Sequence, residues 1–517
     1  MPSTIDEFAR TTPNKPAVIM ADDGTVVTFA ELTERSIRAA HLFARLGLRP
    51  GDGIAVLMDN NPRYFDACWA AQRSGLYYTT VNWHLKPEEA RYVLEDCGAK
   101  VLITTPRLAR TAAEIADGLP LAARLVAGDT QGELPAGFQS LDAATAGMPT
   151  TAPPGELEGA PMIYSSGTTG RPKGVQYPLS NEPYGTGTAA DHVVGTRYSF
   201  GADAVYLSPA PLYHAAPIMW TMIAQRQGGT AVVLRSFDAE LALRTIEHYG
   251  VTLAQFVPTM FIRMLRLPPE VRQRYDLSSL TMAVHAAAPC PVWAKEQMLQ
   301  WWGPIIWEYL GASEGGYVGI GPHEWLDHKG SVGRPEAMPV HVLDDDGNEL
   351  GPGEIGGVYF EGGPRTRYHN DETKTDAAYS PQGWRTVGDV GYLDADGYLY
   401  LTDRKANVIN SGGVKIYPQA VEDVLSGHPA VFDVAVIGVP NEEFGEEVKA
   451  VVQPAGGATP GPELATELIA YCREHLGHYQ CPTTVDFDAE LPRLPSGKLL
   501  KRLIKDRYWQ DRMSRVI

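Results

Sequence analysis

The stretch YSSGTTGRPKG at residues 164–174 combines residue types that suit a phosphate group and few that suit a hydrophobic core. Glycines allow close backbone approach, and successive backbone N–H groups can form a nest for an anion. Lys173 adds a positive charge. Hydroxyls and glycines come from Ser165, Ser166, Gly167, Thr168, Thr169 and Gly170. The segment is not a Walker motif, because Pro172 stands where that motif requires glycine. Composition alone therefore leaves open a phosphate loop or a solvated turn.

Two further segments match the sequence patterns of known cofactor-binding or catalytic motifs. The GxGxxG at residues 351–356 follows a turn and enters a strand-like run, whereas a dinucleotide fingerprint opens a helix, so we interpret it as hairpin turns. The GxSxG at residues 311–315 would make Ser313 the nucleophile of an α/β-hydrolase. Three histidines follow in the required order: His428, His475 and His478. No HGGG-type oxyanion loop is present, and the hydrolase is kept as a less favoured alternative.

Length and charge restrict the classes of protein. The chain has 517 residues and a formal net charge of −18, so we expect at least two domains. Nucleic-acid binding is not expected, because it requires a basic face. Five scattered cysteines without a CxxC pair predict reduced thiols in a cytoplasmic protein. We expect neither a secretory signal nor an integral membrane segment.

The elements that must position these residues follow from apolar periodicity. Residues 53–60 and 100–106 predict buried strands, and 238–250 predicts a helix. Thr28 and Glu31 predict a capping box at another helix. The alternation of strands and helices predicts an α/β fold with layered, largely parallel sheets in a large N-terminal domain.

From about residue 330 the residue pattern changes to one typical of short strands and turns, which predicts a β-rich subdomain. Asp346-Gly347 is a strong hairpin signal there. After Arg404 the pattern is α+β, and Tyr417-Pro418 opens a helix. We therefore predict two domains, residues 1–403 and residues 404–517.

Five segments, in this order along the chain, resemble motifs of one family. They are YSSGTTGRPKG (164–174), YLGASEGG (309–316), GWRTVGD (383–389), LTDRKANVINSGGVKIYP (401–418) and LPRLPSGKLLKR (491–502). Together they resemble the adenylate-forming superfamily of acyl-CoA synthetases, 4-coumarate–CoA ligases, luciferases and adenylation domains. The similarity covers nearly the whole chain.

The resemblance implies a ligase that works in two half-reactions. The carboxylate of a small-molecule acid attacks the α-phosphate of Mg-ATP, which gives an acyl-adenylate and pyrophosphate. Coenzyme A then displaces AMP and leaves an acyl-CoA thioester. The first step adds charge to an anionic phosphate, so preorganised donors, Mg²⁺ and a cation must stabilise that charge. The resemblance also implies a small C-terminal domain that is mobile between the two steps.

Residue roles follow from the same resemblance. The loop at 165–174, with Lys173, would hold the β- and γ-phosphates. Ser313 would bond the α-phosphate, and Glu314 would ligate Mg²⁺. Asp389 would accept the ribose hydroxyls. Further roles fall on Arg404 at the ribose, on Lys498 as the catalytic cation and on Gly413 beside the path of coenzyme A.

The acyl and adenine sites would be built mainly from small residues. Gly311 and Ala312 would line them with backbone, and VHAAAPCP (284–291) resembles a wall of the acyl pocket, with His285 at its rim. His214 resembles the histidine beside that pocket, and a core histidine is the alternative. Four more side chains suit either the pocket or plain core: Met219, Trp220, Phe256 and Met260.

Three departures from the family pattern bear on function. The tyrosine that stacks on adenine is replaced by Leu310, with Tyr309 one position away. The usual hinge residue, an Asp or Lys, is replaced by Ala406, and a lysine of some branches is replaced by Asn410. The missing positive charge would weaken the second half-reaction. An amine acceptor, giving an amide, is the nearest alternative to coenzyme A. The acid is expected to be mid-sized and apolar, alkyl or aryl, and a homodimer is one open assembly state.

Overall fold

Two eight-stranded sheets form the framework of the N-terminal part of the protein. The computed structural model describes residues 4–130, 132–165, 171–336, 338–363, 365–493, 497 and 499–509. One sheet has the strand order β15-β14-β13-β12-β10-β11-β1-β2. Its strands are β1 (Pro16–Met20), β2 (Val26–Thr28), β10 (Val205–Ser208), β11 (Thr230–Val233), β12 (Leu253–Phe256), β13 (Met282–His285), β14 (Ile306–Gly311) and β15 (Tyr317–Ile320).

The second sheet has the strand order β18-β9-β8-β4-β3-β5-β6-β7. Its strands are β3 (Gly53–Leu57), β4 (Tyr77–Thr80), β5 (Ala99–Thr104), β6 (Ala123–Val126), β7 (Phe138–Ser140), β8 (Ala160–Ser165), β9 (Lys173–Gln176) and β18 (Arg367–Tyr368). The run from β8 to β7 is parallel, whereas β9 and β18 are added antiparallel. The predicted layered, largely parallel sheets are confirmed.

Helices cover and separate these sheets. They are α1 (Ile5–Thr11), α2 (Phe29–Arg45), α3 (Arg63–Gln72), α4 (Pro87–Asp96), α5 (Ala109–Ile115), α6 (Leu141–Thr145), α7 (Ala189–Arg197), α8 (Ala215–Arg226), α9 (Ala239–Tyr249), α10 (Pro258–Leu265), α11 (Pro269–Arg272), α12 (Val292–Trp302), α13 (Pro322–Asp327) and α14 (Glu372–Ala377), with the 3₁₀ turn η1 (Pro106–Leu108). Helix α3 is buried from Tyr64 to Gln72, including the polar residues Asp66 and Gln72. The predicted capping box begins α2, where the backbone N–H of Thr28 donates to Glu31 at 2.8 Å.

A four-stranded antiparallel sheet forms the β-rich subdomain. Its order is β16-β17-β19-β20, with β16 (Val340–Leu343), β17 (Gly356–Phe360), β19 (Arg385–Leu393) and β20 (Leu399–Arg404). The GxGxxG at 351–356 lies between β16 and β17 and runs into a strand, so its interpretation as hairpin turns is confirmed.

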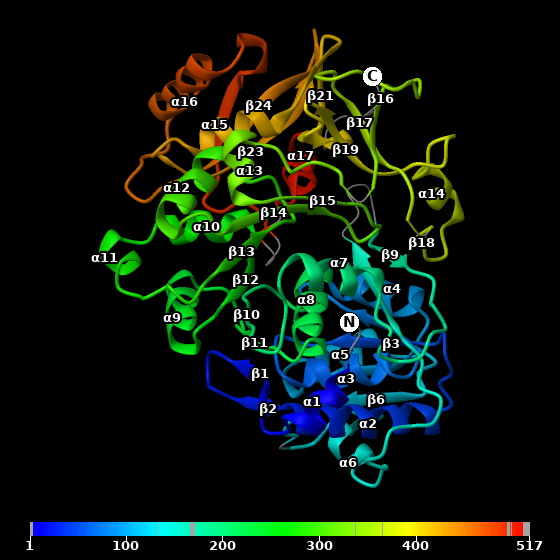
Figure 1. Cartoon of the computed structure of the whole chain (residues 1–517). Helices are drawn as coiled ribbons and strands as arrows, with labels where there is room; N and C mark the ends of the chain where they lie inside the picture. The colour runs from blue at the N-terminus through cyan, green and yellow to red at the C-terminus, as the bar shows by residue number, and fades with distance from the viewer. Residues whose placement is uncertain are drawn as a thin grey trace.

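The C-terminal elements build a fourth sheet. Its five strands are β21 (Ile409–Ser411), β22 (Val414–Ile416), β23 (Val431–Asn441), β24 (Gly445–Pro454) and β25 (Thr484–Phe487). With them go α15 (Pro418–Ser426), α16 (Pro462–His475), α17 (Lys501–Trp509) and the 3₁₀ turns η2 (Lys405–Asn407) and η3 (His478–Gln480). Figure 1 shows these elements, in orange and red, gathered at one end of the molecule near α10, α12 and α13, with α2 and α6 at the other end.

The chain changes sheets close to the predicted domain boundary. Strand β20 ends at Arg404, and the next strand begins at Ile409 in a different sheet. The division into residues 1–403 and 404–517 as domains stays a prediction. None of the helices in the described residues is both long and apolar enough to cross a lipid bilayer.

Candidate nucleotide and acyl site

The antiparallel pairing of β9 with β18 links Lys173, the first residue of β9, to Glu314 through Tyr368. Tyr368 lies opposite Val175 in this pairing, and the Nζ atom of Lys173 lies 5.0 Å from the centroid of the Tyr368 ring. The hydroxyl of Tyr368 donates to Oε1 of Glu314 at 3.0 Å. Two side chains predicted to serve phosphate and metal are therefore joined through one tyrosine that the sequence did not indicate.

The segment that carries Ser313 and Glu314 is held by buried polar groups. The carbonyl of Glu314 accepts a hydrogen bond from Oγ1 of Thr366 at 2.7 Å, and Thr366 accepts one from Arg385 at 3.1 Å. The hydroxyl of Tyr177 donates to the carbonyl of Ser313. Burial raises the pKa of Tyr177 to about 12, with Arg385 opposing and Glu314 adding to the rise.

The residue after Glu314, Gly315, must be glycine. It has φ +103°, a backbone conformation that residues with a side chain rarely adopt, and a Cβ there would lie 2.5 Å from Nη2 of Arg385. The donor set also fits Mg²⁺, which proteins usually hold through one or two carboxylates together with substrate phosphates. Glu314 supplies such a carboxylate, and the Tyr368 hydroxyl orients it.

Asp389 and Arg404, predicted separately for the ribose, form one ion pair. They lie opposite each other in the β19–β20 pairing, with Nε of Arg404 2.6 Å from Oδ1 of Asp389. Asp389 is 5% exposed, whereas Arg404 reaches the surface and also donates to the carbonyl of Val387 at 3.2 Å. The arginine thereby orients the carboxylate.

Strand alternation decides what Leu310 and Tyr309 can contact. Tyr309 stacks between Trp220 and Tyr317, with ring centroids 5.6 and 5.8 Å away, and its hydroxyl accepts from Gln255 at 2.8 Å. Leu310 points to the opposite face and packs on the apolar cluster of the β-rich subdomain. Tyr309 is therefore held in an aromatic core by Trp220, Tyr317 and Gln255.

The predicted acyl wall rests on a buried charged network. His285 is 0% exposed, so its predicted place at a pocket rim is wrong. Its Nε2 lies 3.4 Å from Oε2 of Glu308, and Nζ of Lys295 lies 2.6 Å from the same oxygen. Burial alone would raise the pKa of the Glu308 carboxyl, but Lys295 and His285 outweigh it and lower that pKa to about 2. Burial lowers the pKa of His285, which favours its neutral form.

The remaining acyl candidates divide between a helix start and the core. His214 is the N-cap residue of α8, with its ring 4.6 Å from that of Tyr213. Trp220, Phe256 and Met260 are almost fully buried in core clusters, as their alternative interpretation had it.

Two protein-family models match most of the sequence of this chain. The model described as AMP-binding enzyme matches residues 5–366, and that of the AMP-binding enzyme C-terminal domain matches residues 420–498. The chain belongs to the AMP-binding enzyme family. The resemblance to the adenylate-forming superfamily, in its acyl-CoA synthetase branch, is confirmed.

Relatives of this AMP-binding enzyme span its full length. A feruloyl-CoA synthase of an Amycolatopsis species is 34% identical over 504 residues, which are 97% of each chain. A medium/long-chain-fatty-acid–CoA ligase of Mycobacterium tuberculosis is 31% identical, with 96% of this chain and 88% of the relative covered. Among solved structures, an amide bond synthetase of Marinactinospora thermotolerans has a TM-score of 0.80 at 27% identity, covering 98% and 99% of the two chains.

Several predicted site residues lie outside the described residues. They are Ser166, Gly167, Thr168, Thr169, Gly170 and Lys498, and of Ser165 only the backbone, at the end of β8, is described. Gly497, next to Lys498, is described. A Cβ on it would lie 2.2 Å from Oγ1 of Thr259, so this glycine packs tightly against the start of α10.

Gly413 and the family departures at Ala406 and Asn410 lie in the first C-terminal elements. Gly413, with φ +85°, forms the turn between β21 and β22. Asn410, where some branches of the family have a lysine, pairs across these strands with Lys415. Asp345 binds both Lys415 at 2.7 Å and Lys405 at 3.0 Å, and Ala406 lies in η2 between these contacts.

The hydrolase alternative receives no support from the geometry of this AMP-binding enzyme. His428 lies 3.3 Å from Glu467, and Nδ1 of His475 lies 2.8 Å from the carbonyl of Tyr471. His478 lies in η3. Among the described residues, no hydrogen bond joins Ser313 to any of these histidines. The GxSxG begins at the last residue of β14, Gly311, and continues in the loop that follows.

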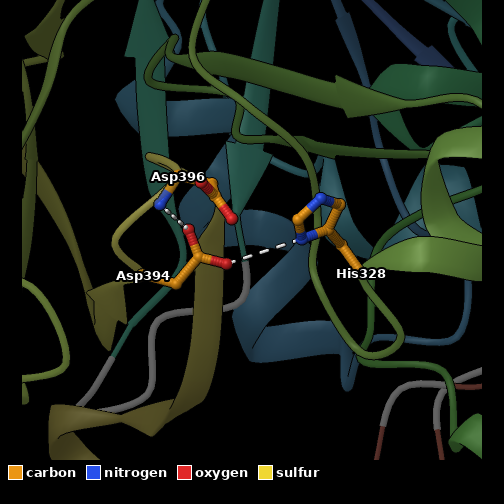
Figure 2. Close-up of side chains that lie close together, drawn as sticks. All are labelled: His328, Asp394 and Asp396. Atoms are coloured by element: carbon orange, nitrogen blue, oxygen red, sulfur yellow. Dashed lines mark hydrogen bonds and ion pairs between the residues drawn. The ribbon is translucent and has the colours of Figure 1, made fainter.

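Outside this site, a second group of side chains has the residue types that can bind a metal ion. His328, Asp394 and Asp396 bring their ligand atoms within 4.8 Å of one another (Figure 2). Oδ1 of Asp394 accepts backbone N–H groups from Asp396 at 3.0 Å and Tyr398 at 2.8 Å, and the His328 ring stacks on Tyr398 at 3.5 Å. These contacts fasten the hairpin turn between β19 and β20, and we assign no metal to it.

Proposed function

We propose that this AMP-binding enzyme is an ATP-dependent acid–CoA ligase that activates a mid-sized apolar carboxylic acid. The main support is a series of contacts in which Tyr368 lies between Lys173 and Glu314. It connects a lysine of the glycine-rich segment to a carboxylate suited to Mg²⁺. The acid would become an acyl-adenylate with release of pyrophosphate. Transfer of the acyl group to coenzyme A would then release AMP.

Each predicted site residue has a role in this reaction. The loop from Ser165 to Gly170, with Lys173, holds the β- and γ-phosphates by backbone N–H groups and hydroxyls. Ser313 bonds the α-phosphate, and Gly311 and Ala312 present backbone to the adenine and acyl groups. Glu314 holds Mg²⁺, which neutralises charge on the phosphates.

The residues of the β-rich subdomain and C-terminal elements complete the site. Asp389, oriented by Arg404, accepts hydrogen bonds from the ribose hydroxyls. Lys498 brings a positive charge to the α-phosphate and the attacking carboxylate. Gly413 leaves room for the pantetheine arm of coenzyme A, and His214 borders the acyl group.

The acyl group is alkyl or aryl. A feruloyl-CoA synthase and a fatty-acid–CoA ligase are among the relatives, at 34% and 31% identity, and these names span both classes. A panel of alkyl and aryl acids, incubated with Mg-ATP, should give acid-dependent pyrophosphate release. Addition of coenzyme A should give thioester and AMP. Pyrophosphate release that no acid on the panel stimulates would contradict the proposal.

Replacement of Glu314 should weaken the use of Mg²⁺. In Glu314→Gln the metal loses an anionic ligand, so the Mg²⁺ concentration for half-maximal pyrophosphate release should rise about tenfold or more. The matched control is Glu324→Gln, because Glu324 also accepts a hydrogen bond from a tyrosine, Tyr398, at 2.8 Å but lies on α13. Equal Mg²⁺ dependence of the Glu314→Gln variant and the wild type would remove Glu314 from the metal site.

Amide formation is the second candidate. The structural likeness to an amide bond synthetase, with a TM-score of 0.80 at 27% identity, favours testing it. The adenylate would be captured by an amine in place of the thiol. Product masses after incubation with coenzyme A and with a set of amines separate the two acceptors.

We place this reaction in the cytoplasm, since all five cysteines are free thiols, the state that this compartment maintains. The homodimer stays a prediction.

A further inference from the structure

Helix α10 contacts the C-terminal elements at both of its ends. At its start, Thr259 lies against Gly497. At its end, Arg266 donates two hydrogen bonds to backbone carbonyls that begin β23, to Val431 at 2.9 Å and to Phe432. The guanidinium of Arg266 also lies 4.6 Å from the centroid of the Phe432 ring.

A second arginine links the two contact points within the C-terminal elements. Arg493 binds Asp433 with two hydrogen bonds of 2.5 and 2.6 Å. The same guanidinium donates to the carbonyl of Gly497. A β-bridge joins Arg493 to Leu499, on the other side of Lys498 in sequence. Residues 431–433 and the ends of the segment around Lys498 are thereby connected through one side chain.

These contacts restrict rotation of the C-terminal elements on the large N-terminal part. The eight residues of α10 span roughly 12 Å at 1.5 Å per residue, so the contacts at its two ends are well separated. A third contact lies nearby, where Nε1 of Trp293 donates to Oγ of Ser426 at 3.1 Å. Separated contacts fix an orientation, whereas one contact would act as a pivot.

We propose that Arg266, acting through the Asp433–Arg493 pair, positions the Lys498 segment for adenylate formation. The inference rests on the proposed function, in which Lys498 acts at the α-phosphate. Arg266 is a positioning residue that touches no substrate. Because the proposed function uses Lys498 in adenylate formation, loss of Arg266 should impair that step and spare transfer to coenzyme A.

The test compares the two half-reactions in Arg266 variants. Adenylate formation is followed by exchange of labelled pyrophosphate into ATP, with the acid that the wild-type protein uses best. Transfer is followed from the synthetic acyl-adenylate of that acid and coenzyme A. Arg266→Met keeps the bulk and removes the donors, and Arg266→Lys keeps one donor group. Arg263→Met alters another exposed arginine, one turn earlier on the same helix.

Arg266→Met should lower exchange about tenfold or more, as expected for loss of hydrogen bonds from a charged group. Arg266→Lys should recover part of this loss, Arg263→Met should match the wild type, and transfer should be unchanged in all three. Arg493→Met should show the same split between half-reactions as Arg266→Met.

Wild-type exchange in Arg266→Met would overturn the positioning role. Equal losses in exchange and transfer would also overturn it, because they indicate general damage to the fold. If the wild-type protein itself shows no acid-dependent exchange, the proposed function fails and the inference fails with it.

Discussion

Lys498→Ala should lower the rate of adenylate formation by about 10²–10³-fold, the usual cost of removing one preorganised group that stabilises transition-state charge. The attacking carboxylate and the α-phosphate are both anionic, so their approach requires a cation. Pyrophosphate release in single-turnover conditions measures this step. Thioester formation from a synthetic acyl-adenylate should stay close to the wild-type rate.

The control for this variant is Arg502→Ala, which removes an exposed cation from α17. It should leave pyrophosphate release unchanged and should unfold at the wild-type temperature, since an exposed side chain contributes little to stability. Full pyrophosphate release by Lys498→Ala would assign the cation's role to another residue.

Lys295→Met should lower the free energy of unfolding of the large N-terminal part by about 3–5 kcal/mol, the range for breaking a buried ion pair on one side. Lys295 is 0% exposed, and its Nζ lies 2.6 Å from Glu308. The methionine fills similar space but leaves the Glu308 carboxylate buried beside His285 without the lysine charge. Chemical denaturation followed by tryptophan fluorescence measures the change.

A double variant separates charge from packing. Lys295→Met/Glu308→Leu replaces the pair by apolar groups and should recover most of the lost stability. A double variant less stable than Lys295→Met would show that Glu308 is not the source of the deficit.

The pH dependence of Lys295→Met provides a second check. The Glu308 pKa, about 2 in the folded protein, lies below the roughly 4.3 of an unperturbed glutamate. The carboxylate therefore stabilises the fold fully above about pH 4.3, and this contribution is lost as the pH falls toward 2. Without Lys295 the carboxyl takes up a proton at higher pH. The deficit of Lys295→Met should consequently be largest at neutral pH and shrink on acidification.

Local structure was well predicted because its causes are local. The capping box of Thr28 and Glu31, the proline that begins α15 and the Asp346-Gly347 turn each depend on residues within a few positions. Ordered motifs also located the segments of the site. The motifs did not reveal which side chains hold those segments in place.

Contacts between distant segments were not predictable from composition or periodicity. Tyr368 and Glu314 are 54 positions apart, and Tyr368 stands in a stretch without a distinctive pattern. Its role follows from the β9–β18 pairing, which no local sequence pattern predicts. Arg385 did carry a signal, since it lies inside the GWRTVGD segment, but the segment does not reveal that the guanidinium supports the Glu314 backbone through Thr366.

The buried network at β13 and β14 was misjudged for a related reason. Small residues around His285 suggested an open pocket wall, whereas the neutralising partners Glu308 and Lys295 come from β14 and α12. A charged residue in an apolar strand signals that a partner exists. It does not identify that partner.

Acid-dependent exchange of labelled pyrophosphate into ATP tests the central claim most directly, because it requires reversible formation of an acyl-adenylate and nothing beyond it. With Mg²⁺, ATP and a panel of alkyl and aryl acids, label should enter ATP only when a suitable acid is present. Absence of exchange with every acid, by a folded protein, would contradict the claim that this site activates carboxylates through ATP.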